Sequence, residues 1–404
     1  MKIGVIGAGI SGLTIARLLN KTHEVIVFEK TNNIGGIAQT RDVNGIAYHT
    51  VGGHCLNSKN KLVMDFIFEN VLPKEKFNKI QRNAKIDFKG NLISYPIEYA
   101  MKEIAKFDDE LALKFTKDFF AAADKNSDNL AEWFRQKFGT SLAEEYFIPY
   151  NKKIWQIEPS KMSHLWVEGK LPMPQKKDFF KSLIHEARDN MPHSFYYYPI
   201  SNNQNTFIEA LAKGVNIKKN FEVSELTRKN KSWSINNEEV FDVVINTMPL
   251  DKLPFTIKNC PINVQEYAKK LKYNKVTNML WKSKPTNRTW TYYPSSETIF
   301  HRLIHVGNPS CHTITESMGE HSYNKMVEYG NKIDLLLEPL SYNVSEHAYV
   351  VYDQHYKEST SKIKAYLSDI GLYTLGRFGE WEYYNMDICI ESAMKLAKNI
   401  EELK

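Results

Sequence analysis

The chain has little of what marks disulfide-stapled, membrane-spanning or nucleic-acid-binding proteins. Its 404 residues include only four cysteines, widely spaced and without a CxxC pair, which argues against a disulfide framework or a zinc cluster and predicts a reducing, cytoplasmic location. No stretch approaches the roughly 18 uninterrupted apolar residues that a spanning helix requires. The 53 basic and 47 acidic residues are interspersed, so the net charge of +6 predicts no nucleic-acid partner.

The composition is that of a folded protein with more than one domain. Hydrophobic residues make up 42% and aromatic residues 12% of the chain, which is too many for a disordered protein. A chain of 404 residues also exceeds the usual size of a single core, so two or three domains are expected. Internal repeats and low-complexity tracts are absent, which indicates domains woven together by long insertions.

The first 30 residues read as a βαβ unit with a glycine-rich turn. A buried strand over 2–6 is followed by Gly7, Gly9 and Gly12, then by a helix over 13–20 and a second strand over 24–29. Glycines in this turn let the backbone approach a pyrophosphate, and the amides at the helix start offset its charge. Glu29 ends the second strand, where an acid can accept a hydrogen bond from a ribose hydroxyl. The alternative is a glycine turn without a ligand.

A second glycine pair, Gly35 and Gly36, follows Glu29 by six residues. This spacing resembles the FAD-binding variant of the dinucleotide fold rather than the NAD-dehydrogenase type. Near the other end of the chain, Gly376 and Arg377 precede a predicted helix that starts near Asp387, which offers a second helix start for an anion. The sequence therefore favours FAD over NAD.

Periodicity divides the remaining chain into helical and strand-rich parts. Apolar spacing predicts helices over 107–123, 130–138 and 386–403, a hairpin over 84–95, a central strand over 242–246 and further strands within 276–352. We predict an α/β protein with a Rossmann-like FAD-binding domain, an inserted helical domain and an antiparallel β-sheet domain. The expected ranges are 1–85, 193–260 and 366–404 for the first, 86–192 for the second and 261–365 for the third.

Four further segments resemble one family throughout, the UDP-galactopyranose mutases, and more closely their eukaryotic-type branch. This family lies within the wider superfamily of FAD-dependent amine oxidases and protoporphyrinogen oxidases. The resemblance spans essentially the whole chain. The segments are Val51–His54 (Val-Gly-Gly-His), Pro149–Trp155 continuing to Pro172, Trp290–Pro294 with Phe300–Arg302, and Gly376–Asp387.

The resemblance implies roles for residues on the substrate side. His54 would lie against the isoalloxazine, and Asn151 and Trp155 would hold the uracil. Tyr292 and Arg302, ten residues apart as in the family, would grip the diphosphate. The catalytic residues implied are Arg302, Lys170, His54, Tyr292 and Tyr383, and those implied to bind substrate are Asn151, Trp155, Trp166, Lys170, Tyr292, Arg302 and Tyr383.

The cofactor would be held by residues from both ends of the chain, and no metal is expected. With the glycine motifs above, the residues implied are Gly7, Gly9, Ser11, Gly12, Glu29, Lys30, Gly35, Gly36, Gly53, Val223, Gly376, Arg377, Asn385, Met386 and Asp387.

Three departures from the family pattern leave the sugar open. Lys170 stands where the family has an arginine, which keeps the charge and loses the bidentate geometry. Asn202 and Asn203 replace a glycine pair, and two residues are missing between Tyr383 and Asn385 relative to the eukaryotic form.

The activity implied is a redox-neutral interconversion of the pyranose and furanose forms of a UDP-hexose, in which N5 of reduced FAD attacks the anomeric carbon. NAD(P)H could serve as external reductant. The alternatives are an FAD-dependent oxidoreductase of the amine oxidase or protoporphyrinogen oxidase type, and a flavin-bound scaffold without turnover. The hexose, the nucleotide and a homo-oligomeric state stay open.

Overall fold

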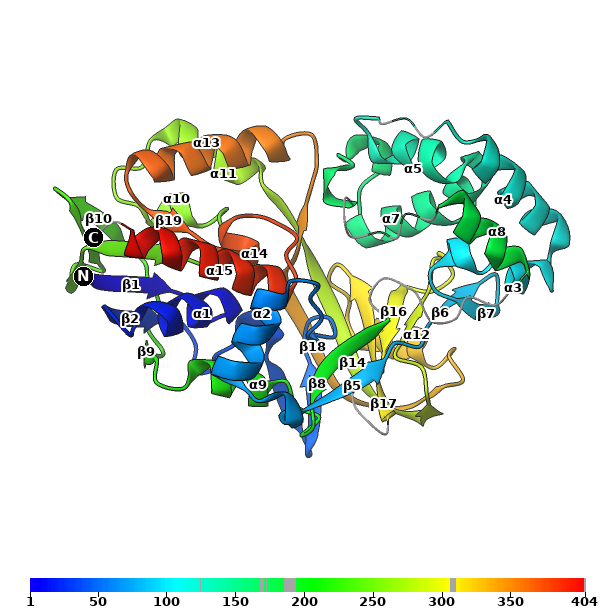
Figure 1. Ribbon diagram of the computed structural model, residues 1–404, viewed down its shortest axis with the longest axis horizontal. Helices are drawn as coiled ribbons and strands as arrows, with labels where there is room; N and C mark the ends of the chain where they lie inside the picture. Colours follow the sequence, from blue (N-terminus) through cyan, green and yellow to red (C-terminus); the bar gives the residue numbers. More distant parts are fainter. Residues whose placement is uncertain are drawn as a thin grey trace.

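The structure is a computed structural model that describes residues 1–123, 125, 127–167, 171, 173, 175–184, 194–305 and 310–402, with the backbone alone at residue 310. A parallel sheet with its helices forms one end, where both termini lie, and a helical lobe forms the other (Figure 1). A large mixed sheet lies beside both. Among the described residues, no helix has the length and apolarity needed to cross a membrane.

The first sheet is parallel and carries the predicted βαβ unit. Its order is β19 (Tyr373–Thr374), β13 (Val243–Asn246), β1 (Lys2–Ile6), β2 (Glu24–Phe28) and β9 (Asn216–Lys218). Val243 and Ile245 pack in the cluster that contains α1 (Ile10–Leu19) and α15 (Met386–Glu401), whereas Val244 packs in the cluster on the opposite face. Because side chains alternate along a strand, both faces of this sheet are buried, as a parallel sheet requires.

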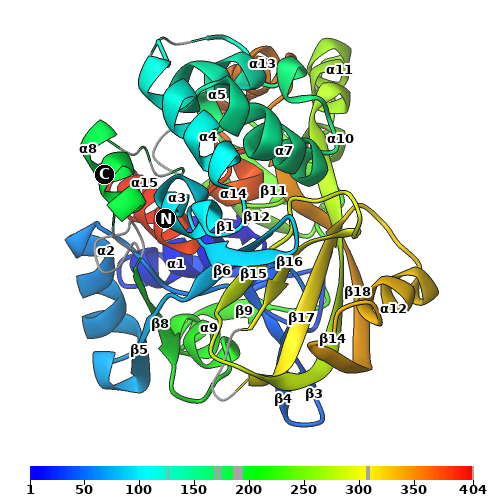
Figure 2. The same ribbon diagram turned by 90° about the vertical axis from the view of Figure 1, so that its right-hand side faces the viewer.

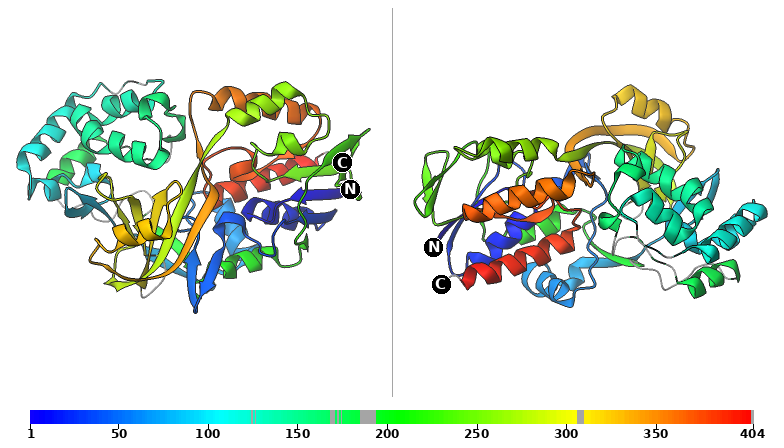
Figure 3. Two further views of the ribbon diagram at one scale, coloured as in Figure 1. Left: turned by 180° about the vertical axis from the view of Figure 1, so that it is seen from behind. Right: turned by 90° about the horizontal axis from the view of Figure 1, so that it is seen from above.

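Different layers cover the two faces of the parallel sheet. On one face α1 packs against α15 and against α9 (Asn205–Ala212). On the other face Gly4 meets Ile235 and Phe241 of a three-stranded antiparallel sheet. That sheet is formed by β10 (Leu226–Lys229), β11 (Ser232–Ile235) and β12 (Glu239–Phe241), and helices α10 (Leu253–Thr256), α11 (Ile262–Lys270) and α13 (Tyr356–Asp369) lie on the same side of the molecule (Figure 3).

The second sheet has seven strands and is antiparallel except for one pair, β15 with β6. Its order is β18 (Leu336–Val351), β14 (Lys272–Thr286), β17 (Ser310–Met318), β16 (Phe300–Ile304), β15 (Trp290–Tyr292), β6 (Ala84–Phe88) and β7 (Asn91–Ser94). The predicted hairpin over 84–95 is therefore present and extends this sheet. The range 86–192, expected to be helical, thus begins with strands of the neighbouring sheet.

Helices build the lobe at the end away from the termini (Figure 2), and aromatic side chains pack inside it. The predicted helices over 107–123 and 130–138 are confirmed as α4 and α5. Each begins at a residue whose side chain accepts a hydrogen bond from the first turn, Asp108 and Asn129 respectively. Phe119 and Phe179 stack with ring centroids 4.0 Å apart. The helices are α3 (Met101–Ala105), α4 (Asp109–Ala121), α5 (Leu130–Phe138), α6 (Thr140–Leu142), α7 (Ile148–Trp155) and α8 (Lys176–Ile184).

Smaller elements connect the three parts. Strand β5 pairs with β8, and β3 pairs with β4. The long strands β14 and β18 belong to the large sheet and lead to helices α11 and α13, so they connect the large sheet to the part of the molecule that contains the parallel sheet (Figure 1). The remaining elements are β3 (Thr40–Val43), β4 (Ile46–His49), β5 (Phe77–Gln81), β8 (Phe195–Pro199), α2 (Lys61–Asp65), α12 (Tyr323–Gly330) and α14 (Gly376–Gly379).

Candidate active site

The glycine turn between β1 and α1 is a tight backbone cradle. Gly7 has φ +97°, a conformation that favours glycine. A Cβ on Gly12 would lie 1.9 Å from the Gly7 carbonyl oxygen, so no other residue fits there. Around Gly9, by contrast, no described atom beyond Gly9 and its two chain neighbours lies within 4 Å of where a Cβ would stand. The turn is therefore closed by two glycines and open at the third, which leaves room for a ligand beside the start of α1.

Glu29 and the second glycine pair hold this turn from the side. The main-chain N of Ala8 donates to Glu29 Oε2 at 2.9 Å, and the N–H of Thr31 donates to Oε1 at 3.0 Å. Gly9 forms a parallel bridge with Gly35. The predicted ribose acceptor is thus an anchor of the glycine turn, and its contact with a ribose stays a prediction.

The segment Gly376–Arg377 lies against the start of α1, whereas the helix predicted to start near Asp387 is α15, which begins at Met386. Gly376, with φ +87°, approaches α1 so closely that a Cβ would lie 2.2 Å from Ser11 Oγ. Arg377 donates to the carbonyl of Tyr384 at 3.1 Å and to that of Ala348 at 2.8 Å. Its Nε is buried and has no hydrogen-bond partner within the described part of the chain. The start of α1 and a guanidinium with an unused donor fit the phosphates of a dinucleotide.

The remaining residues predicted to hold the cofactor differ in exposure. Lys30 and Asn385 are exposed, and Gly53 and Asp387 are half-buried. Val223 and Met386 are buried. Contact of each of these residues with the cofactor stays a prediction.

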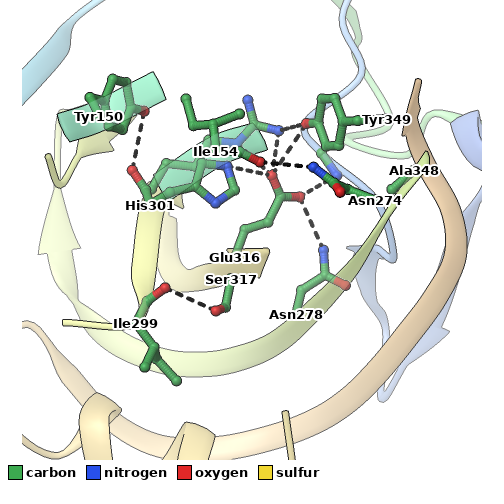
Figure 4. A network of polar contacts seen from close by, with 12 residues as sticks. Tyr150, Ile154, Asn274, Asn278, Ile299, His301, Glu316, Ser317, Ala348 and Tyr349 are labelled. Atoms are coloured by element: carbon green, nitrogen blue, oxygen red, sulfur yellow. Dashed lines mark hydrogen bonds and ion pairs between the residues drawn. The ribbon is translucent and has the colours of Figure 1, made fainter. Parts of the chain in front are cut away.

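Four neighbouring strands of the large sheet present a row of polar side chains. The register pairs Tyr292 with Arg302, Arg302 with Glu316, and Glu316 with Asn278 across β15, β16, β17 and β14. Cross-strand partners lie on one face of a sheet, so this row faces the same way. Figure 4 shows the centre of this row, where the fully buried Glu316 is surrounded by donors.

Glu316 joins the predicted phosphate-binding arginine to the Gly-Gly-His loop. Arg302 Nε donates to Oε1 at 2.7 Å, and the main-chain N of Gly52 donates to Oε2 at 2.6 Å. Burial alone would raise the pKa of the Glu316 carboxyl, but the charge of Arg302 and the hydrogen bond from His301 lower it well below its usual range. Glu316 is therefore a carboxylate that fixes Arg302 and the loop against each other.

Two histidines beside this carboxylate are neutral at pH 7. Burial lowers the pKa of His301 to about 4, although its Nε2 lies 3.1 Å from Glu316 Oε1. A bulge in β16 between Phe300 and Arg302 lets His301 and Arg302 both reach Glu316. Burial, followed by the charge of Arg377, lowers the pKa of His54 to about 4, and the buried His54 Nε2 has no hydrogen-bond partner among the described residues.

An aromatic wall continues from Arg302 to the helical lobe. Arg302 Nη2 donates to Tyr349 Oη at 2.6 Å, and Tyr349 stacks on Tyr383 with centroids 5.6 Å apart. Tyr383 meets Trp155 edge-on at 5.9 Å, and Trp155 meets Trp166 at 4.6 Å. The structure thus brings together side chains from the large sheet, α7 and the C-terminal region.

Asn151 and Trp155, the predicted uracil contacts, are buried and bonded to each other. Trp155 Nε1 donates to Asn151 Oδ1 at 3.1 Å, and Asn151 Nδ2 donates to the carbonyl of Phe147 at 2.8 Å. Their contact with a base stays a prediction. Lys170 lies outside the described residues.

Three residues of the site are not among those predicted from the sequence: Glu316, Tyr349 and Arg82. Each comes from a strand or a strand end whose neighbours in space are far away in sequence: Arg82 Nη2 donates to Tyr292 Oη at 2.7 Å across 210 positions. In the sequence, Glu316 is visible only as a charged residue inside the alternating strand Thr313–Ser317. Its partners cannot be identified without the register of the sheet.

Comparisons with known proteins show similarity to a dinucleotide-binding domain and to two sugar-nucleotide mutases. Residues 5–69 match the model of an NAD(P)-binding Rossmann-like domain. A UDP-galactopyranose mutase from Mycoplasma pneumoniae is 24% identical over 193 residues, which are 44% of this chain and 46% of that protein. A dTDP-fucopyranose mutase from Escherichia coli is 27% identical over 169 residues, 40% of this chain and 43% of that protein. The chain thus matches less than half the length of each of these curated relatives.

The likeness in fold covers the whole chain. A crystal structure of reduced UDP-galactopyranose mutase superposes with a TM-score of 0.86 at 21% identity and covers 100% of this chain and 96% of that one. The resemblance expected from the motifs is confirmed: the chain is similar in sequence to nucleotide-sugar mutases, and it has the fold of UDP-galactopyranose mutase.

Proposed function

We propose that the chain is a flavin-dependent mutase that interconverts the pyranose and furanose forms of a nucleotide-linked hexose. The observation that carries the proposal is the polar row headed by Tyr292 and Arg302, set beside a Gly-Gly-His loop that Glu316 fixes in place. A fixed guanidinium next to tyrosine hydroxyls suits an oxygen-rich diphosphate. An oxidoreductase of the amine oxidase type would instead need an apolar or amine-binding pocket.

FAD fits the backbone cradle described above. Gly9 leaves space for a pyrophosphate at the start of α1, Arg377 offers an unused buried donor, and Glu29 lies at the end of β2. When bound and reduced, FAD supplies a nucleophilic ring nitrogen for the anomeric carbon of the sugar. We further propose that NAD(P)H is the external reductant, which direct measurement of flavin reduction by NADPH tests.

The residues of the wall would bind and hold the leaving diphosphate. Arg302 keeps its charge: burial lowers the pKa of its guanidinium, but Glu316 and the neighbouring tyrosines together raise that pKa well above its ordinary value. Tyr292, Tyr383 and Lys170 would add donors around the same oxygens, and Trp155 and Trp166 would exclude water beside the base. His54, neutral at pH 7, would lie against the flavin without adding a charge.

The nucleotide and sugar are proposed at the level of class. Relatives named for UDP-galactopyranose and for dTDP-fucopyranose both support a nucleoside diphosphate hexose, and we take a UDP-hexose as the first candidate. A cytoplasmic location and a homo-oligomeric state stay predictions.

The experiment incubates the FAD-loaded chain, reduced with dithionite under nitrogen, with UDP-galactopyranose and with dTDP-fucopyranose, and separates products by chromatography. We expect a furanose product from one of these sugars with the reduced form and none with the oxidised form. Equal product from both forms, or none from any sugar nucleotide, contradicts the proposal.

Arg302→Lys tests the role of the guanidinium in the same assay. The ammonium keeps the charge but loses the fork, so kcat/KM should fall about 100-fold or more, the range for removing one charge-stabilising donor. Lys284→Arg is the matched control, because Lys284 forms an exposed pair with Asp334 near the end of β14, and it should leave kcat/KM unchanged.

A further inference from the structure

Arg82 is a second cation beside the candidate site, in contact with Tyr292. It lies between β5 and β6, and its guanidinium packs over the rings of Trp290 at 4.7 Å and Tyr95 at 5.5 Å. Its Nη2 donates to Tyr292 Oη at 2.7 Å. Its Nε is buried and has no hydrogen-bond partner in the described ranges.

The two arginines that flank Tyr292 differ in charge balance. Arg302 is neutralised by Glu316, with Nη2 and Oε1 2.5 Å apart. Arg82 has no carboxylate partner within the part of the chain that the structure describes; its contacts are aromatic rings and one hydroxyl. Arg82 is half-buried, so water screens only part of its charge, and a ligand that brings an anion would be stabilised by the remainder.

The hydrogen bond from Arg82 also determines whether the hydroxyl of Tyr292 donates or accepts toward other groups. A guanidinium has only donors, so Tyr292 Oη must accept the hydrogen bond from Arg82. The phenolic proton of Tyr292 is then left to donate to another group. Because Tyr292 and Arg302 are cross-strand partners, that proton becomes available on the face of the sheet that carries Arg302.

We infer that Arg82 and Tyr292 form a second anion-binding pair, which receives the diphosphate of the nucleotide sugar beside Arg302. The inference rests on the proposed function and deepens it. The guanidinium of Arg302 is paired with a carboxylate, whereas the charge of Arg82 is available to the ligand. Arg82 contributes its charge and its unused Nε donor, and it orients Tyr292 as a donor.

The test measures binding without turnover, by calorimetric titration of the oxidised, FAD-loaded full chain with UDP and with uridine. Arg82→Gln should weaken UDP binding about 10- to 100-fold, the range for one charge-assisted hydrogen bond, and leave uridine binding unchanged. Arg82→Lys should recover part of the loss because it keeps the charge. The matched control is Arg228→Gln, since Arg228 also lies over a tryptophan, Trp233 at 5.8 Å, but is exposed on strand β10.

Melting temperature and flavin content verify that each variant is folded. If Arg82→Gln fails to fold, Tyr292→Phe is titrated instead, and it should weaken UDP binding several-fold without affecting uridine. Equal UDP affinity in wild type and variant, or an equal loss for UDP and uridine, overturns the role of Arg82 while leaving the proposed function intact. Wild-type protein that binds no nucleoside diphosphate contradicts both.

Discussion

The cofactor cradle and the aromatic wall are built in opposite ways. The cradle is made of backbone: glycines that exclude a Cβ, the start of a helix, and one carboxylate that accepts from main-chain N–H groups. The wall, taken here together with the polar row from which it continues, is made of side chains. Arg302, Glu316 and Tyr349 meet there from three strands of one sheet. A backbone cradle depends on short local sequence, whereas the wall depends on the register of distant strands. The two regions should therefore fail differently when they are changed.

The largest effect is expected in the cradle, from Gly12→Ala. Its Cβ would stand 1.9 Å from a main-chain oxygen, so the turn must open. We expect the free energy of unfolding to fall by about 3 kcal/mol or more, at the upper end of overpacking costs, and FAD to be lost. Urea denaturation and the flavin absorbance of purified protein measure the two effects.

Gly9→Ala is the matched comparison within the same turn. Gly9 has φ −76° and open space at its Cβ, so the stability of the apoprotein should change by less than about 1 kcal/mol. Flavin content should nevertheless fall, because the methyl group occupies ligand space. Full flavin content in Gly9→Ala would show that this space is not used by the cofactor.

The next largest effect is expected in the wall, from Glu316→Gln. The change leaves the buried charge of Arg302 uncompensated, which should lower the free energy of unfolding by about 3 kcal/mol. Glu320→Gln, which breaks an exposed pair with Lys275, should cost less than about 0.5 kcal/mol. Similar losses from the two changes, measured by urea denaturation, would mean that Glu316 does not organise the wall.

The smallest effect is a dependence on pH at Glu98, a buried residue between β7 and α3. Burial raises the pKa of its carboxyl to about 8. The folded state then holds a proton that the unfolded state has lost, so this group's contribution to stability falls as pH rises from about 4.5 to 8 and is constant above. Glu98→Gln should therefore be more stable than wild type at pH 8, by about 1 to 3 kcal/mol, and not at pH 4.5.

Urea denaturation at both pH values tests this linkage. A constant difference between the Glu98→Gln variant and wild type across the range would mean that Glu98 does not titrate between them.

Most of the cradle could be predicted from the sequence because its geometry is local. The spacing of Gly7, Gly9 and Gly12 after a buried strand fixes a turn, and the helix that follows begins where the turn ends. The helices over 109–121 and 130–138 were equally visible, since apolar spacing and capping residues mark them. Their ends differ from the predicted ends by at most two residues.

The wall could be predicted only in part. Motif resemblance pointed to Arg302, Tyr292 and Tyr383, but Glu316 and Arg82 are recognised only through their partners across the sheet. The edge hairpin shows the same limit: its strands were visible in the sequence, and its pairing with β15 was not. Pairing between distant strands is set by the packing of the whole sheet, which no local pattern encodes.

The most direct test measures how many product molecules form for each pair of electrons that the flavin receives. FAD-loaded protein is reduced once with a limiting amount of dithionite under nitrogen, given a sugar nucleotide that it converts, and followed by flavin absorbance and chromatography. We expect many furanose molecules per flavin while the flavin stays reduced. One product molecule per two electrons consumed, with the flavin reoxidised, would contradict a redox-neutral mutase.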